Sequence, residues 1–368
     1  MRIKHVELNV IEQPLKVPFH TSYGTYLQRE SIIVKMIDDS GTTGYGEVVA
    51  FSEPWYTEET IQTALHVLDL FLIPLILEKD IIHPSEASEL FKCFKGHHMA
   101  KAGLEGALWD IYSKQQNLSL ANVLGGSRDT IPVGVVVSLA NTEKMVQQIK
   151  VYQQEGYERF KVKVDKQRDY EIVSMIREHF PEISLMIDAN SAYTIKDIDQ
   201  LKRLDEFKLL MIEQPFGDRE FIQHAELQKE MKTPICLDES IHCIEDVKLA
   251  ITLGACRIIN VKPARVGGLT ESLKIHELAL KHDVPLWVGG MIETGISRVQ
   301  NIALASLPGF TIPGDISASS RHWEEDIIRP DVQLQNGKVM VPQEAGIGVE
   351  VDEERIERLT KLKKRYLR

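Results

Sequence analysis

The sequence predicts an α/β protein in which an α+β first domain precedes a closed barrel of parallel strands. The first 50 residues alternate apolar and polar side chains, as antiparallel strands do, and residues 58–124 have the three-to-four-residue spacing of helices. From residue 131 onward, short β-rich runs alternate with amphipathic helices, which is typical of βα units. We therefore expect a capping domain at 1–125, a barrel at 126–324, and a C-terminal segment at 325–368 that completes the cap.

The capping domain is expected to begin with a small antiparallel meander. Asp38-Asp39-Ser40-Gly41 has the composition of a turn between two of its strands, and the helical region that follows stops at Gly125-Gly126. In the C-terminal segment, Asn336-Gly337 predicts a hairpin turn. A last helix is expected to end in the basic run of Lys361, Lys363, Lys364 and Arg365, where cations suit the negative end of the helix dipole.

Eight β-rich runs are predicted to be the strands of the barrel, and eight is the number that a closed barrel of this type requires. They span 133–138, 159–164, 184–188, 209–213, 234–238, 257–262, 285–289 and 310–315. Active sites of parallel barrels lie at the C-terminal ends of the strands. Polar residues that end these runs are therefore the candidates for chemistry.

Five charged residues end five successive runs. They are Lys163, Asp188, Glu213, Asp238 and Lys262, spaced 25, 25, 25 and 24 residues apart, so that one βα unit separates each from the next. A single acidic residue at a strand end can equally be the N-cap of the following helix. Five charged residues with one period instead predict a ring of side chains at one level of the barrel mouth.

Three carboxylates in one ring would repel one another, and a bound cation would offset that repulsion. Because the ring contains no His or Cys, a hard ion such as Mg²⁺, or a similar ion such as Mn²⁺, is favoured over zinc. Lys163 and Lys262 flank the acids, either as acid and base on opposite faces of a substrate or merely as neutralising charges. Lys161 and the metal should help Lys163 to lose its proton, which favours proton transfer at the carbon next to a carboxylate.

Composition excludes several classes of function. A formal net charge of -11 argues against a nucleic-acid-binding surface, and no run approaches about 18 uninterrupted apolar residues, so no membrane span is expected. The four cysteines show no Cys-x-x-Cys spacing, which favours reduced thiols in a cytoplasmic enzyme over a thiol-bound zinc.

The motifs around these positions resemble those of the enolase superfamily, and in order and spacing those of its muconate-lactonising-enzyme subgroup. The matching segments are Lys161-Val-Lys163, Asp188-Ala-Asn190, Ile212-Glu-Gln-Pro215, Leu237-Asp-Glu-Ser240, residues 261–268 and Ala107-Leu-Trp-Asp110. The resemblance implies a modified TIM barrel, (β/α)7β, beneath an α+β N-terminal capping domain. It also implies magnesium held by Asp188, Glu213 and Asp238, with Lys163 and Lys262 as acid/base groups.

Within this subgroup the chain resembles the family of o-succinylbenzoate synthases that can also racemise N-succinylamino acids. The resemblance implies a lyase of menaquinone biosynthesis that dehydrates a succinylated cyclohexadiene carboxylate. The alternative is a racemase of N-succinylamino or other N-acylamino acids, and a metal- and carboxylate-binding protein without turnover is a third hypothesis. Asp315-Ile-Ser317 lacks the second acid of dipeptide epimerases, and residues 288–295 lack the histidine of mandelate-racemase-like enzymes.

The resemblance also implies which residues surround a bound carboxylate substrate. Phe19 belongs to a segment, 18–24, that resembles the lid of the family, although a plain surface turn is the alternative. Related proteins associate, so a homo-oligomer is expected. The full set of expected substrate contacts is Lys161, Asn190, Ser138, Arg265, Phe19, Gly290, Met291 and Ile292.

Overall fold

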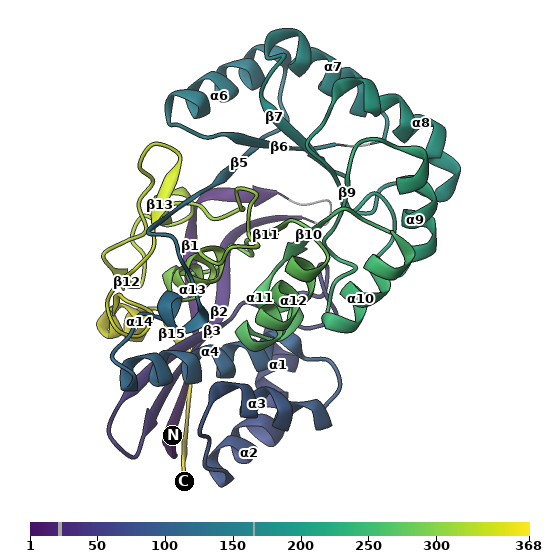
Figure 1. The fold of residues 1–368 in the computed structure, drawn as a ribbon. Helices are drawn as coiled ribbons and strands as arrows, with labels where there is room; N and C mark the ends of the chain where they lie inside the picture. The colour runs from purple at the N-terminus through teal and green to yellow at the C-terminus, as the bar shows by residue number, and fades with distance from the viewer. Residues whose placement is uncertain (21–23, 165) are drawn as a thin grey trace.

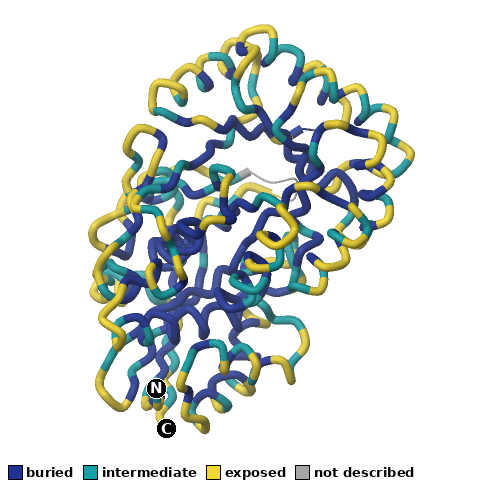
Figure 2. The backbone as a smooth tube through the Cα atoms, viewed as in Figure 1, coloured by how far each residue is buried: buried dark blue, intermediate teal, exposed yellow. Residues whose placement is uncertain are grey.

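A four-stranded antiparallel sheet and a seven-stranded parallel sheet form the framework of the chain (Figure 1). The computed structural model describes residues 1–20, 24–164 and 166–368. Residues 21–23 of the expected lid lie outside this range. In Figure 2 the buried backbone follows the cap sheet and the barrel strands, whereas the outer helices carry the exposed positions.

The antiparallel sheet of the cap has the strand order β15-β1-β2-β3. Its strands are β1 (Ile3–His20), β2 (Thr25–Asp38), β3 (Thr43–Val48) and β15 (Thr360–Leu367). Helix α4 (His98–Gln115) lies so close to β3 that a Cβ on Gly46 would be 2.0 Å from the carbonyl oxygen of Gly103. The N- and C-terminal strands pair with each other, so the end of the chain is part of the cap.

The expectation of a helix over the basic C-terminal run is wrong. Helix α14 (Glu353–Leu359) ends before the run, and the basic residues lie in β15. Successive side chains of this edge strand point to opposite faces of the sheet, and its basic side chains contact acidic residues of neighbouring elements. Arg365 contacts Glu7 at 2.8 Å and Lys364 contacts Asp69 at 2.5 Å.

One helical run of the cap is long and apolar enough to cross a membrane by length and composition alone, which the sequence analysis did not expect. It consists of α1 (Ile61–Val67), a π-helical turn (Leu68–Leu72) and α2 (Ile73–Glu78). In the π-helical turn the N–H of Ile73 donates to the carbonyl oxygen of Leu68, five residues earlier. Buried apolar side chains of the run belong to the cap core, together with residues of α4 and the sheet, so packing accounts for its composition. Helix α3 (Pro84–Leu90) and a 3-10 turn (Phe91–Cys93) complete this layer.

Seven parallel strands form the barrel in sequence order, from β5 to β11. The strands are β5 (Gly134–Val137), β6 (Arg159–Lys163), β7 (Ser184–Asp188), β8 (Ile212–Glu213), β9 (Ile235–Leu237), β10 (Ile258–Val261) and β11 (Leu286–Val288). The helices are α6 (Thr142–Gln154), α7 (Asp169–His179), α8 (Ile198–Arg203), α9 (Phe221–Glu230), α10 (Ile244–Leu253), α11 (Pro263–Val266), α12 (Leu269–Lys281) and α13 (Gly295–Ala305). Helices α6 to α10 follow the outside of the sheet in Figure 1, so the predicted α/β barrel is confirmed.

The predicted eighth strand, 310–315, forms isolated bridges and not a ladder. Phe310 pairs with Leu286 of β11, and Gly314 pairs with Val133 just before β5, so the segment spans the gap between the two edge strands. Pro313 has no N–H to donate, which is unfavourable for a regular central strand. The barrel is therefore of the expected (β/α)7β type, with an irregular last member.

Short elements make up the remaining secondary structure of the described residues. They are α5 (Leu120–Leu124), β4 (Thr130–Pro132), β12 (Ile328–Arg329), β13 (Lys338–Met340), β14 (Glu350–Val351) and 3-10 turns at Ile195–Asp197, Leu204–Phe207 and Ser319–Arg321. The predicted hairpin turn at Asn336-Gly337 is confirmed, because both residues have positive φ and Gln335 and Lys338 exchange two backbone hydrogen bonds.

Candidate active site

Sheet register pairs three of the charged strand ends directly with one another. Lys163 pairs with Asp188, and Asp188 pairs with Glu213, in the adjacent strands β6, β7 and β8. Glu213 pairs with Cys236, however, which lies two residues before Asp238. Leu237 pairs with Ile259, so Lys262 is likewise two residues beyond the position opposite Asp238. Because the strands of a barrel are tilted and staggered, such two-residue offsets keep side chains of successive strands near one height, so the register is consistent with the expected ring.

Lys161 lies at the centre of the acidic ring. Its Nζ is 2.7 Å from Glu213 Oε2, 2.9 Å from Asp188 Oδ2 and 3.1 Å from Asp315 Oδ2. Burial would lower the pKa of Lys161, but Asp188, Asp315 and Glu213 together raise it well above the usual range. Its ammonium is thus already paired with protein carboxylates, and the expected contact of Lys161 with substrate remains a prediction.

Lys262, directly after β10, is held on the other side of the site. Its Nζ donates to Asp238 Oδ2 at 2.8 Å and to the hydroxyl of Tyr56 at 2.9 Å. Arg265 is also buried, bonds the second oxygen of Asp238, and donates to Tyr56 at 3.1 Å. Arg265 therefore holds Asp238 in this structure, and its expected contact with substrate is a prediction that the geometry does not favour.

Lys163 is the exposed lysine of the site, with 52% of its side chain accessible. Its Nζ donates to Asn190 Oδ1 at 2.7 Å and is 3.8 Å from Asp188 Oδ2. Asn190 in turn donates to Glu239 Oε1 at 3.2 Å. An incoming substrate can therefore reach the side chain of Lys163. The side-chain amide of Asn190 orients this lysine.

The carboxylates of the ring titrate very differently. Burial, and then repulsion by Asp188, raises the pKa of Glu213 to about 8 even though Lys161 lowers it. Burial would also raise the pKa of Asp238, but Arg265 and Lys262 lower it well below its usual range. Burial and the neighbouring carboxylate thus outweigh the charge of Lys161 at Glu213, an imbalance that an added cation would reduce.

Asp188, Glu213 and Asp238 form a donor set that suits a hard divalent cation. In the part of the chain that the structure describes, no group of three or more His, Cys, Asp or Glu side chains surrounds one metal position. Lys161 contacts two of the three acids and Lys262 the third. Glu213 Oε2 faces Lys161 but receives no aligned hydrogen bond, so the residues fit a cation that displaces Lys161.

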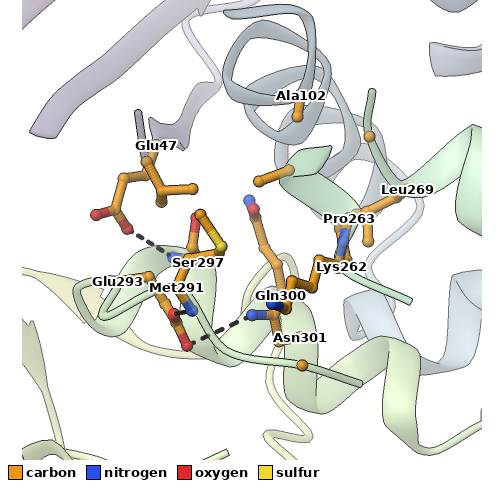
Figure 3. A pocket seen from close by; sticks show the side chains of 14 residues that line it. Glu47, Ala102, Lys262, Pro263, Leu269, Met291, Glu293, Ser297, Gln300 and Asn301 are labelled. Carbon is orange, nitrogen blue, oxygen red and sulfur yellow. Dashed lines mark hydrogen bonds between the residues drawn. The ribbon is translucent and has the colours of Figure 1, made fainter. Parts of the chain in front are cut away.

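A pocket opens beside Lys262, between the cap and the barrel (Figure 3). It is a small cavity of about 20 Å³, lined by Ala102 of α4, by α11 and by residues around α13. Met291 and Glu293 lie on its wall, and the backbone N–H of Met291 donates to Glu293 at 2.6 Å. Two of the predicted site residues line this pocket: Lys262, predicted to be catalytic, and Met291, predicted to contact substrate.

Four other expected contacts are not among the residues that line this pocket. Ile292 has a φ of 57°, an uncommon conformation for a β-branched residue, and directly follows Met291. Ser138 is exposed just after β5, and its N–H donates to Gln148 at 3.1 Å. Phe19 lies in β1 with its ring 6.1 Å from that of Trp55. A Cβ on Gly290 would be 2.6 Å from the carbonyl oxygen of Asp315, so close packing accounts for this glycine.

Sequence reasoning missed three residues of the site. Tyr56 comes from the cap and touches both Lys262 and Arg265. Glu239 was quoted only as part of a motif. Asp315 was used only to show that the segment Asp315-Ile-Ser317 lacks a second acidic residue, and its hydrogen bond with Lys161 was not predicted. Asp315 could have been predicted from the sequence, because it ends the eighth predicted strand as the other charged residues end theirs. Tyr56 does not end a predicted strand, so the same reasoning could not have found it.

Comparison with known proteins places both parts of the chain in known families. Residues 5–125 match the family model described as mandelate racemase / muconate lactonizing enzyme, N-terminal domain. Residues 144–355 match the family model described as enolase C-terminal domain-like. The two matches correspond to the cap and to the barrel with most of the segment after it.

Individual relatives are similar over nearly their whole lengths. An o-succinylbenzoate synthase of Bacillus subtilis is 54% identical, with 96% of this chain and 95% of the relative covered. An N-succinylamino acid racemase of Thermus thermophilus is 44% identical, with 100% and 99% covered. A crystal structure of an enolase superfamily member from Listeria innocua matches with a TM-score of 0.97 at 44% identity, with 100% and 99% covered.

Proposed function

The chain belongs to the mandelate racemase / muconate lactonizing enzyme family of the enolase superfamily, and on this premise we propose that it has o-succinylbenzoate synthase activity. The reaction would dehydrate 2-succinyl-6-hydroxy-2,4-cyclohexadiene-1-carboxylate to 2-succinylbenzoate. The observation that carries the proposal is the placement of two lysines, Lys163 and Lys262, on two sides of one group of carboxylates. Relatives that bear this activity in their names, at 45–54% identity, support it.

Lys163 is proposed to move the proton. Its Nζ is exposed and is held by a neutral amide, so a substrate carbon can approach it. The neutral amine would take the proton from the carbon next to the carboxylate and later give it to the departing hydroxide, which leaves as water. A positioned general base of this kind contributes about 10²–10⁴-fold.

Lys262 is proposed to stabilise the negative charge that develops on the substrate. It is buried, and although burial lowers the pKa of Lys262, Asp238 raises it well above the usual range. The ammonium therefore keeps its proton during dehydration. A fixed charge in a closed site costs no reorganisation when the substrate becomes an enediolate, which is the condition for strong electrostatic stabilisation.

Asp188, Glu213 and Asp238 are proposed to hold Mg²⁺, or a similar ion such as Mn²⁺. Such an ion, when bound, would supply the positive charge that stabilises the doubly charged carboxylate. Lys161 would then keep Asp315 as its remaining partner among its three carboxylates.

Racemisation of N-succinylamino acids or other N-acylamino acids is the second candidate function. The observation that favours it is the second lysine, because two bases of one kind can exchange protons with an α-carbon from opposite sides. Both substrates carry an acyl arm, and we propose that Met291 contacts it, together with Gly290, Ile292, Ser138 and Phe19.

The deciding experiment gives the purified protein the cyclohexadiene substrate and N-succinylphenylglycine in parallel. Each is assayed with magnesium, after complete chelation, and after magnesium is restored. We expect dehydration with magnesium, its loss on chelation and its recovery. Activity that survives complete chelation would contradict the metal mechanism, and turnover of the amino acid alone would favour the racemase.

A further inference from the structure

Glu239 is a partly buried carboxylate to which the proposed reaction assigns no role. It directly follows Asp238 but does not share its partners: its Oε1 accepts from Asn190 Nδ2 at 3.2 Å. Its Oε2 is buried and has no hydrogen-bond donor among the residues that the structure describes. A buried carboxylate oxygen without a hydrogen-bond donor destabilises the folded state, so we expect the one hydrogen bond of Glu239 to have a role.

Asn190 connects this carboxylate to Lys163. An amide has an acceptor end and a donor end, and here Oδ1 accepts from Lys163 Nζ at 2.7 Å while Nδ2 donates to Glu239. If the amide were reversed, its N–H₂ group would face the lysine, which has no acceptor when charged, and its oxygen would face the carboxylate. Glu239 therefore favours the same orientation of Asn190 as the charged lysine does, in which Oδ1 is presented to Lys163.

The backbone around Asn190 is held without Glu239. The N–H of Asn190 donates to Asp188 Oδ1 at 3.1 Å, and the N–H of Ser191 donates to the carbonyl oxygen of Gln214 at 2.8 Å. Both Asn190 and Ser191 have positive φ within this tight loop. Removing the side chain of Glu239 should therefore release the amide and leave the loop in place.

We propose that Glu239 is a positioning residue for Lys163, acting through Asn190 on one face of the substrate. The other face is held differently, because Lys262 bonds Asp238 and Tyr56, and in the described chain neither Glu239 nor Asn190 hydrogen-bonds to it. The inference rests on the proposed function and adds a residue to it. It predicts a defect confined to the face of Lys163, which a general loss of structure would not produce.

The test measures exchange of the α-proton in D₂O for each enantiomer of N-succinylphenylglycine, with magnesium present. Lys163→Ala and Lys262→Ala first show which enantiomer depends on which lysine. Glu239→Ala should slow exchange of the Lys163-dependent enantiomer about 10–100-fold and change the other by less than about threefold, since small misplacements of a catalytic group cost up to about 10². Glu239→Gln keeps an oxygen that can accept from Asn190 and should restore most of the rate.

Two results would overturn the inference: equal slowing of both enantiomers, or no slowing in Glu239→Ala. Crystal structures of the wild type and Glu239→Ala give a second readout that needs no turnover. Lys163 bonded to Asn190 Oδ1 in the variant as in the wild type would also overturn it. If the wild type acts on neither substrate, the proposed function fails, while the two crystal structures still decide whether Glu239 orients Asn190.

Discussion

Lys262 donates to Asp238 over 2.8 Å, and both side chains are at least nine-tenths buried. Asp238 also bonds Arg265, so the pair is fixed on both sides. Lys163, by contrast, is half-exposed and 3.8 Å from Asp188. The two lysines are therefore not equivalent: one is a held, charged group and the other is open to substrate.

Replacing Lys163 by Ala should abolish dehydration and racemisation together. The variant lacks the group that removes the proton, so we expect kcat to fall by at least about 10²–10⁴-fold, the contribution of a general base. Initial rates for both substrates, with circular dichroism as a control for folding, provide the measurement. Normal dehydration by this variant would remove Lys163 as the base.

Replacing Lys262 by Ala should also abolish racemisation, but for a different reason. Arg265 still neutralises Asp238 in the variant, so the fold should persist while the second face of the substrate loses its acid/base group. Exchange of the α-proton should survive for one enantiomer, as deuterium incorporation followed by NMR would reveal. Undiminished racemisation would contradict the two-base scheme.

Tyr56→Phe tests the contribution of the cap to the site. The hydroxyl bonds Lys262 and Arg265, and loss of one net hydrogen bond costs about 0.5–1.5 kcal/mol, so kcat should fall about 3–10-fold. Steady-state kinetics would measure this. Tyr45→Phe is the matched control, because that hydroxyl bonds Glu353 outside the site and its loss should leave kcat unchanged. Equal kcat values for Tyr56→Phe and wild type would show that this contact has no catalytic role.

Asp315→Asn should weaken magnesium binding. Asp315 is the partner of Lys161 that lies outside the proposed ligand set, so without its charge Lys161 would hold Asp188 and Glu213 more firmly against the metal. A charge-assisted hydrogen bond is worth about 1.5–3 kcal/mol, so we expect Kd to rise about tenfold or more in calorimetric titration of metal-free protein.

Asp197→Asn provides the control for this comparison, since it removes a lysine–aspartate pair, with Lys166, that is not part of the site. Its magnesium affinity should equal that of the wild type. An unchanged Kd in Asp315→Asn would show that Lys161 leaves the ring without help from Asp315.

The strand ends could be predicted because a βα unit has a regular length. One period of about 25 residues was enough to place Lys163, Asp188 and Glu213 in neighbouring strands. The two-residue offset of Asp238 from the position opposite Glu213 depends on how the strands tilt when the barrel closes, which no local pattern records. The bonds of Lys161 to three acids could not be predicted either, because its side chain enters the interior that the same closure creates.

Contacts between distant segments account for the other differences. Tyr56 and Lys262 are 206 residues apart, and they meet only because the cap packs over the mouth of the barrel. The C-terminal run has the charges of a helix end, but pairing with β1 gives its backbone hydrogen-bond partners along one side. Local composition could not distinguish these alternatives, since tertiary contacts override weak propensities.

His224 gives a pH-dependent test of stability that is independent of catalysis. Its Nε2 accepts from the N–H of Phe216 at 3.2 Å, shortly after Glu213 in the chain, and burial lowers the pKa of His224 to about 4. The folded state therefore favours neutral imidazole, while the unfolded chain takes up a proton near pH 6.5. This contribution is complete above about pH 6.5 and is lost as the pH falls toward about 4, by roughly 2–3 kcal/mol.

His224→Gln should reduce this pH dependence, because the amide oxygen can still accept from Phe216 but does not titrate. Urea unfolding of the metal-free protein at about pH 7 and about pH 4.5 would give the two free energies of unfolding for each protein. We expect the wild type to lose more stability than the variant between these conditions. Equal losses would mean that the buried imidazole is not a source of the acid sensitivity.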